Sequence, residues 1–240
     1  MSFRLECKKI RRTGLIGAFL CGGIAAAAFP VINTAARPDT FTAMSGSPTA
    51  VLMNANYEMT ALLNLLLLTA GACILYHIEF ADNGIQKMQS LPLRESGMFR
   101  GKLILLLMFF LVMVLFETAS LYFCGLHWLN AELSEIIKVA ENLGFAVLLT
   151  LPAAVISLVI ASACRNMWIV LGIGVLCIFA ATQLSAGGFI LTLFPYALPF
   201  HIFSGMETVQ AVQCCIAAVC ETVAAYAAGI IYLKVRRLFA

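Results

Sequence analysis

The chain has 240 residues, of which 62% are hydrophobic and only 11% are charged. Ordinary soluble domains have about 45–50% apolar and about 25% charged residues, so much of this apolar surface belongs against lipid. This composition excludes a soluble enzyme, a nucleic-acid-binding module and a disordered protein. We expect one transmembrane domain that spans residues 1–240.

Six stretches are long and apolar enough to cross the hydrocarbon core, which takes about 20 residues. They are residues 13–35, 58–80, 103–125, 143–163, 168–192 and 211–233. The sequence therefore predicts an all-α membrane protein with six transmembrane helices. The first stretch also follows the pattern of a signal peptide, but its apolar run is longer than a usual signal core, which favours a retained span.

The distribution of basic residues predicts the orientation. With six spans, thirteen of the fifteen Lys and Arg residues fall on the side that carries both termini, and only Arg37 and Lys138 fall on the other. Because cytoplasmic loops of membrane proteins are enriched in Lys and Arg, both termini are predicted to be cytoplasmic.

The segment before the first span, residues 2–12, places Phe3, Cys7 and Ile10 on one helical face among basic residues. This spacing predicts a short helix that lies in the membrane interface. A frayed basic tail that only sets the topology is the alternative.

Motifs for catalysis, nucleotide binding and metal binding are missing from the sequence. Gly97 and Gly101 are separated by three residues and no hydroxyl follows Lys102, so no phosphate-binding loop is formed. The three histidines fall in separate span ends or loops, which disfavours a shared metal site. Eight of the nine cysteines lie in or beside apolar stretches, and we interpret them as buried free thiols rather than a disulfide framework.

Residues 79–102, between the second and third spans, carry the most informative cytoplasmic pattern. A helical segment ends at Leu91-Pro92, since the residue before a proline is disfavoured in the helical region. Leu91, Pro92 and Leu93 then form a small apolar corner between charged flanks. Such a corner indicates a docking site for another protein, with a solvated connector as the alternative.

Residues 194–207, on the predicted outer side, are apolar but contain Pro195, Pro199 and Gly205. They are too hydrophobic for a free loop and too interrupted for a span. Non-helical backbone at membrane depth needs a cover of protein or a water-filled cavity, so we expect a re-entrant or interfacial helical pair. The alternative is a partly buried loop that packs on the outer helix ends.

Two acids lie inside predicted spans, Glu117 in the third and Glu221 in the sixth. Ionisable side chains in membrane helices usually face the bundle interior or a cavity. These two residues either form hydrogen bonds between helices or take part in transport, and the sequence leaves both alternatives. Together with Pro195, Tyr196 and Pro199, they are the candidate residues of a transport pathway.

The cytoplasmic pattern resembles that of the ABC-2 type transporter permeases. An acid ends the second span, Gly84 and Ser90-Leu91-Pro92-Leu93-Arg94 follow, and Lys102 opens the third span. The length, the six spans and the outer segment Phe194-Pro195-Tyr196-Ala197-Leu198-Pro199 are similar to the lantibiotic-immunity and bacitracin-resistance permease subfamily.

This resemblance implies the fold of type V exporters, with a cytoplasmic coupling helix over residues 82–91 and outer re-entrant helices around residues 187–207. It implies a homodimer, or a pair with a sibling permease, in a bacterial plasma membrane. Two separate ATP-binding subunits below this pair are expected to hold the ATP and Mg²⁺. This chain is therefore expected to have no cofactor and no enzymatic activity of its own. The implied cargo is an antimicrobial peptide such as a lantibiotic, exported or cleared from the outer leaflet. The implied ATPase-coupling residues are Glu79, Asp82, Gly84, Met88, Leu91, Pro92, Leu93 and Arg94.

The main alternative is an ion-coupled secondary transporter in which Glu117 and Glu221 carry protons or cations. Many such transporters are built from internal repeats, and the two halves of this chain share no motif.

Overall fold

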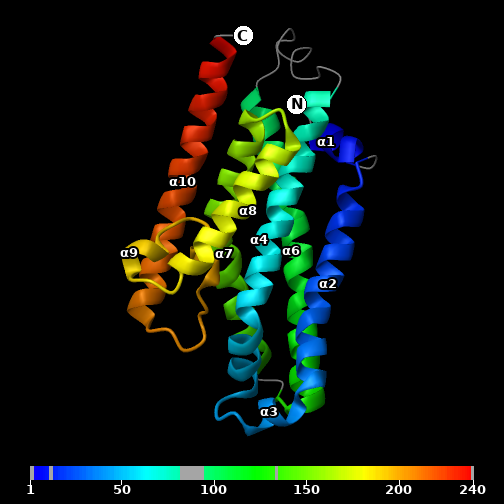
Figure 1. The fold of residues 1–240 in the computed structure, drawn as a ribbon, viewed down its shortest axis with the longest axis vertical. Helices are drawn as coiled ribbons and strands as arrows, with labels where there is room; N and C mark the ends of the chain where they lie inside the picture. Colours follow the sequence, from blue (N-terminus) through cyan, green and yellow to red (C-terminus); the bar gives the residue numbers. More distant parts are fainter. Residues whose placement is uncertain (1–2, 11–12, 82–94, 133–134, 239–240) are drawn as a thin grey trace.

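The computed structural model describes residues 3–10, 13–81, 95–132 and 135–238. The helices, in chain order, are α1 (Phe3–Ile10), α2 (Leu15–Ala36), α3 (Pro38–Ala43), α4 (Pro48–Phe80), α6 (Glu95–Trp128), α7 (Glu135–Ala163), α8 (Met167–Leu184), α9 (Phe189–Thr192), the 3-10 helix η2 (Leu198–Phe200) and α10 (Thr208–Leu238). The long helices run side by side along the longest axis of the molecule (Figure 1). Among the described residues, six helices are long and apolar enough to cross a membrane, which confirms the expected all-α architecture with six candidate spans.

The two ends of the bundle differ in what they carry. α1 and the last turn of α10 lie at one end, which we call the terminal end, and α3 lies at the opposite end, which we call the distal end (Figure 1). Helix α4 is central, because it packs against α2, α6, α7 and α8. Its buried side chains include Leu65, Leu68 and Tyr76. α2 and α10 lie at opposite edges of the bundle (Figure 1).

Small residues let α2 approach its neighbours closely. A Cβ atom added at Gly22 would overlap Leu67 of α4, and one at Gly23 would lie 3.2 Å from Met113 of α6. Close backbone approach of this kind increases van der Waals contact between membrane helices, where lipid supplies no hydrophobic driving force between them.

Several helices extend beyond the apolar stretches that the sequence analysis selected. α4 begins at Pro48, ten residues before the expected span, because Ser47 accepts a hydrogen bond from the Ala50 N–H and Pro48 occupies the first helical position. α6 and α7 also begin several residues earlier than expected. Hydropathy marks only the apolar part of a helix, whereas backbone hydrogen bonding continues until a cap or a break.

The fifth expected span is shorter than predicted, since α8 ends at Leu184 rather than at residue 192. Gly187 and Gly188 follow, and glycine is a poor helix former. The chain then forms the short helices α9 and η2, which lie part-way along the long axis and not at the distal end beside α3 (Figure 1).

The segment around η2 is held inside the bundle. Tyr196, Ala197 and Leu198 are at most 1% exposed. The Tyr196 hydroxyl forms a 2.8 Å hydrogen bond with the Ser157 hydroxyl of α7. The bundle therefore covers this irregular stretch and pairs its buried polar side chain, as the burial of polar groups requires.

All nine cysteines are free thiols. Cys73, Cys124 and Cys214 are buried, as expected for small apolar side chains, whereas Cys21 and Cys220 are exposed on α2 and α10. The expectation of burial is therefore wrong for these two, because their apolar surroundings are outward faces of edge helices rather than a protein core.

The close packing at Gly71 can be tested by substitution. A Cβ atom there would lie 2.6 Å from the Phe19 ring and 2.8 Å from Leu106, and both side chains are almost fully buried. Gly71→Ala should therefore destabilise the protein by about 1–3 kcal/mol through overpacking. The matched control is Gly172→Ala, which meets no atom within 4 Å. Thermal unfolding in detergent measures both, and equal melting temperatures for the two variants would contradict this packing.

Candidate functional site

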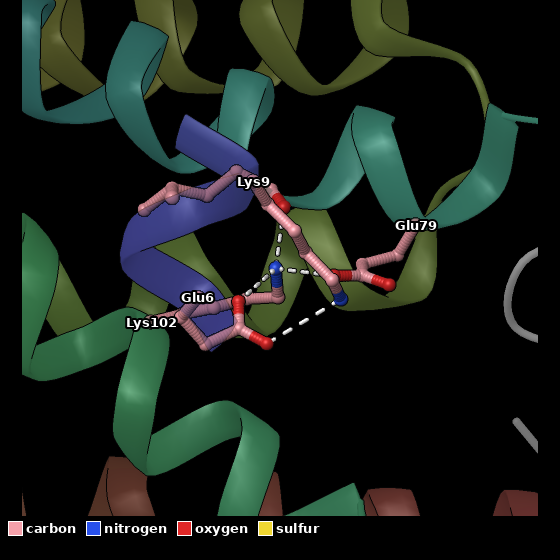
Figure 2. A network of polar contacts seen from close by, with 5 residues as sticks. Glu6, Lys9, Glu79 and Lys102 are labelled. Atoms are coloured by element: carbon pink, nitrogen blue, oxygen red, sulfur yellow. Dashed lines mark hydrogen bonds and ion pairs between the residues drawn. The ribbon is translucent and has the colours of Figure 1, made fainter. Parts of the chain in front are cut away.

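Four charged side chains meet inside the terminal end of the bundle (Figure 2). Lys102 Nζ of α6 lies 2.9 Å from Glu79 Oε1 of α4 and 3.2 Å from Glu6 Oε2 of α1. Lys9 Nζ of α1 lies 2.7 Å from Glu79 Oε1 and 3.4 Å from Glu6 Oε1. We call Glu6, Lys9, Glu79 and Lys102 the ion cluster. It joins three helices that are far apart in sequence.

The ion cluster balances charges that are almost completely removed from solvent. The side chains of Glu6, Glu79 and Lys102 are at most 5% exposed, and Lys9 is 31% exposed. Two carboxylates face two ammonium groups, so the formal charge is zero. Lys102 Nζ also donates to the Leu75 backbone carbonyl at 2.7 Å. A buried charge is tolerated only when it is paired and hydrogen-bonded, and Lys102 meets both conditions.

The face with which α1 packs differs from the face that the sequence predicted. Glu6 and Ile10, four residues apart, are buried, whereas Cys7 is exposed. The apolar pattern pointed to Cys7 and Ile10, because it gave no weight to a glutamate that a distant lysine neutralises. A frayed tail is excluded for residues 3–10, which form a helix.

The predicted coupling residues divide into two groups. Glu79 belongs to the ion cluster. Asp82, Gly84, Met88 and Leu91–Arg94 lie outside the described residues. The helices on either side of them, α4 and α6, are joined directly by the pair Glu79–Lys102. This pair lies three residues before and eight residues after residues 82–94.

A second polar feature is a cavity between α4, α6 and α7. Its polar lining includes Asn56, Asn64 and Glu117, and its water-accessible volume is about 50 Å³. Glu117 is 4% exposed, and its Oε2 accepts a 3.0 Å hydrogen bond from Asn64 Nδ2. Glu117 lies eleven residues before the distal end of α6 at Trp128, about 16 Å along the helix.

The other predicted pathway residues are distributed differently. Pro199 lines the same cavity as Glu117. Tyr196 packs in a core cluster with Leu65 and Ala153, and Pro195 is half-buried. Glu221 of α10 is half-buried and is not among the residues that line this cavity. Only Glu117 and Pro199 of the five are thus brought to one site.

Sequence reasoning missed the neutral polar residues of the cavity. Asn56, Thr60 and Asn64 recur at intervals of four on α4, and Asn142 and Thr150 are eight apart on α7. The sequence signal that could have revealed this cavity is a row of polar residues at helical spacing in an otherwise apolar span. Asn142 also binds the segment after η2, because its Oδ1 accepts from the Ser204 N–H at 3.0 Å.

Comparison with known proteins gives the family. A family model described as ABC-2 family transporter protein matches residues 2–182, which is three quarters of the chain. The chain belongs to the ABC-2 family of transporter proteins. It is therefore a membrane permease subunit of an ABC transporter, and the family works with an ABC ATP-binding subunit.

The matched part of the permease contains the ion cluster and the α4, α6 and α7 residues that line the cavity around Glu117, but not Pro199. It ends within α8, so α9, η2 and α10 lie beyond it. No match to the chain was found among curated proteins or among solved structures. Among the described residues, no group of three or more His, Cys, Asp and Glu side chains could hold a metal ion.

The ion cluster of the permease can be tested by removing one charge and then restoring neutrality. Lys102→Met leaves Glu6 and Glu79 facing a single ammonium group, and should destabilise the protein by about 3–5 kcal/mol. The double variant Lys102→Met, Glu79→Gln leaves one acid and one lysine, and should recover part of that loss. Thermal unfolding in detergent measures both.

The matched control for this experiment is Lys8→Met, because Lys8 is an exposed lysine of α1, the helix that carries Glu6 and Lys9. It should leave the melting temperature within a few degrees of the unsubstituted protein. A double variant less stable than Lys102→Met alone would show that charge balance is not what the ion cluster provides.

Proposed function

We propose that this permease transmits the movement of a separate ABC ATP-binding subunit to α4 and α6, and so moves a cargo across a bacterial plasma membrane. The observation that carries the proposal is the buried pair Glu79–Lys102, which ties together the two helices that flank residues 82–94. A force applied to that stretch would reach both helices at once, because neither can shift without breaking a desolvated ion pair.

Residues 82–94 are the proposed contact with the ATP-binding subunit. The support from the sequence is the apolar corner Leu91-Pro92-Leu93 between charged flanks and its resemblance to the coupling region of ABC-2 permeases. Glu79, at the start of this region, has in our proposal an indirect role, because its carboxylate is engaged in the ion cluster.

The proposed orientation places the terminal end in the cytoplasm. Thirteen of fifteen Lys and Arg residues support it through the positive-inside rule. α9 and η2 are in this view an outer re-entrant segment, which is supported by their position part-way along the bundle (Figure 1).

The proposed assembly has two permease subunits, identical or sibling, above two ATP-binding subunits that supply ATP and Mg²⁺. It is supported by the resemblance to ABC-2 permeases, and by the apolar side chains that α8 and α10 expose, which include Leu176, Phe179 and Val223. These side chains require lipid or a second permease subunit around them.

The proposed cargo is a cationic amphipathic peptide such as a lantibiotic, exported or cleared from the outer leaflet. The proposal rests on the resemblance to peptide-immunity permeases and on the acids Asp39, Glu132 and Glu141, which are exposed towards the distal end. A cationic peptide would be attracted to such a face, more strongly at low ionic strength.

The coupling proposal predicts that Leu91→Asp together with Leu93→Asp abolishes co-purification of an ABC ATP-binding subunit from the membranes of the source cell. Charge on the apolar corner would oppose its burial in a partner groove. Immunoprecipitation in mild detergent with mass spectrometry measures this. The matched control is Leu238→Asp, since Leu238 is 82% exposed at the same end of the bundle. Undiminished recovery of the ATP-binding subunit with the double variant would contradict the docking role.

The cargo proposal predicts that cells with the permease and its ATP-binding subunit tolerate a several-fold higher concentration of a cationic lantibiotic than cells with the subunit alone. The minimal inhibitory concentration measures this. The variant Leu91→Asp, Leu93→Asp should remove the protection, because the permease no longer binds the ATP-binding subunit. Protection that persists in this variant, or that is absent with the unsubstituted permease, would count against the cargo or its coupling.

A further inference from the structure

A groove lies between α6 and α10 at the terminal end of the bundle. Its volume is about 520 Å³, and α6 contributes Ser96 and Arg100 to one wall. The opposite wall is formed by α10, which packs mainly against α7 and touches α6 only over a short stretch. The rings of Phe99 on α6 and Tyr226 on α10, with centroids 5.8 Å apart, are part of that contact. The two helices therefore leave an open space between them on the terminal side of this ring pair.

The wall that α10 contributes changes from apolar to basic along the helix. Tyr226 and Ile230 are half-buried, whereas Lys234 and Arg237 are exposed near the end of the helix. These residues follow one another at intervals of four, four and three, so they share one face of α10. From Tyr226 to Arg237 the helix rises about 16 Å. The groove thus has an apolar part towards the middle of the bundle and a basic part at the terminal end.

The basic part of the groove carries positive charge without a matching acid. Arg100 comes from α6, and Lys234 and Arg237 come from α10. Among the described residues that line the groove, none is acidic. Arg100 and Lys234 form no ion pair with the residues that the structure describes. In the ion cluster, by contrast, two carboxylates balance the two lysines. A bound anion would balance the charge of the groove.

The order of apolar and basic residues matches the order of groups in a phospholipid. The acyl chains of a phospholipid lie in the hydrocarbon core, and its phosphate group lies at the edge of that core. Arginine binds phosphate through two parallel hydrogen bonds, and lysine binds it as a point charge. Basic pockets between transmembrane helices bind anionic lipid headgroups in this way. A zwitterionic headgroup would add a further cation to the groove, so a lipid with net negative charge fits better.

Two other occupants fit the groove less well. A second copy of the chain, related by a two-fold axis through the groove, would place the same cations against each other, which is unfavourable. The ATP-binding subunit would approach from the cytoplasm in the proposed orientation. It would cover the basic part but not the apolar part, because Tyr226 lies about 16 Å further along the helix than Arg237. A phospholipid fills both parts.

We propose that the groove between α6 and α10 binds one anionic phospholipid. Arg100, Lys234 and Arg237 hold its phosphate group. An acyl chain lies along Tyr226 and Ile230 and continues into the bilayer. The site lies within one subunit and needs no ATP-binding subunit, so it is independent of the proposed transport function.

The test is native mass spectrometry of the full-length permease, purified in detergent and titrated with phosphatidylglycerol and phosphatidylcholine that carry the same acyl chains. We expect one phosphatidylglycerol per chain, bound at least tenfold more tightly than phosphatidylcholine. Arg100→Gln together with Lys234→Gln should weaken the binding of phosphatidylglycerol more than tenfold, because each basic residue close to an anionic lipid contributes about fivefold.

The matched control is Lys8→Gln together with Arg165→Gln, which also removes one lysine and one arginine. Both residues are exposed, and neither is among the residues that line the groove. This variant should bind phosphatidylglycerol as tightly as the unsubstituted permease. Equal losses in the two double variants would show that the net charge of the protein attracts the lipid, and would overturn the proposal. Equal binding of the two lipids by the unsubstituted permease would overturn it as well.

If the variant Arg100→Gln, Lys234→Gln does not fold, the unsubstituted permease decides. Phosphatidylglycerol with a photoreactive acyl chain should label α10 between Tyr226 and Leu233 or the first turns of α6, and labelling confined to other helices would contradict the proposal. Inorganic phosphate at the concentration of the lipid should not displace it, because phosphate has no acyl chain. Displacement would assign the groove to a soluble anion instead. The co-purification experiment with Leu91→Asp, Leu93→Asp is unaffected by these results.

Discussion

The charge of Lys102 is the feature on which the terminal end of the bundle depends. Its side chain is 1% exposed, and its ammonium group contacts carboxylates from two other helices. Since a buried charge without partners costs several kcal/mol, α1, α4 and α6 can pack here only in the arrangement that brings Glu6, Glu79 and Lys102 together. The ion pairs thus fix the position of helices whose apolar surfaces alone would allow sliding.

The need of buried polar groups for partners also shapes the rest of the bundle. Its surroundings are apolar, and polar side chains turn inward. Asn56 and Asn64 face a cavity rather than the outside. Tyr196 reaches Ser157 from an irregular segment that the bundle covers. The outward faces of α8 and α10 instead carry large apolar side chains such as Leu176 and Val223. In such a protein the inward polar contacts determine which helices pack together, because the outward apolar side chains can pack equally well against lipid or another helix.

The two halves of the permease bundle differ in the polar contacts that join α4 to α6. At the terminal end the stretch proposed to meet the motor is flanked by helices tied by ion pairs. In the distal half, α4, α6 and α7 surround a polar cavity, and Asn142 binds the chain that follows η2. In the proposed function, a movement of the ATP-binding subunit would enter at the terminal end, where the ion pairs hold α4 and α6 together.

The sequence by itself determined the all-α class, six candidate spans and the family resemblance, because hydropathy and local motifs depend on residues near one another in the chain. It also identified Glu117 as unusual. It did not find that Glu6 is buried, that α8 ends at Leu184, or that Asn64 is the partner of Glu117. The pairs Asn64–Glu117 and Glu6–Lys102 join residues 53 and 96 positions apart, so only the packing of the helices decided them.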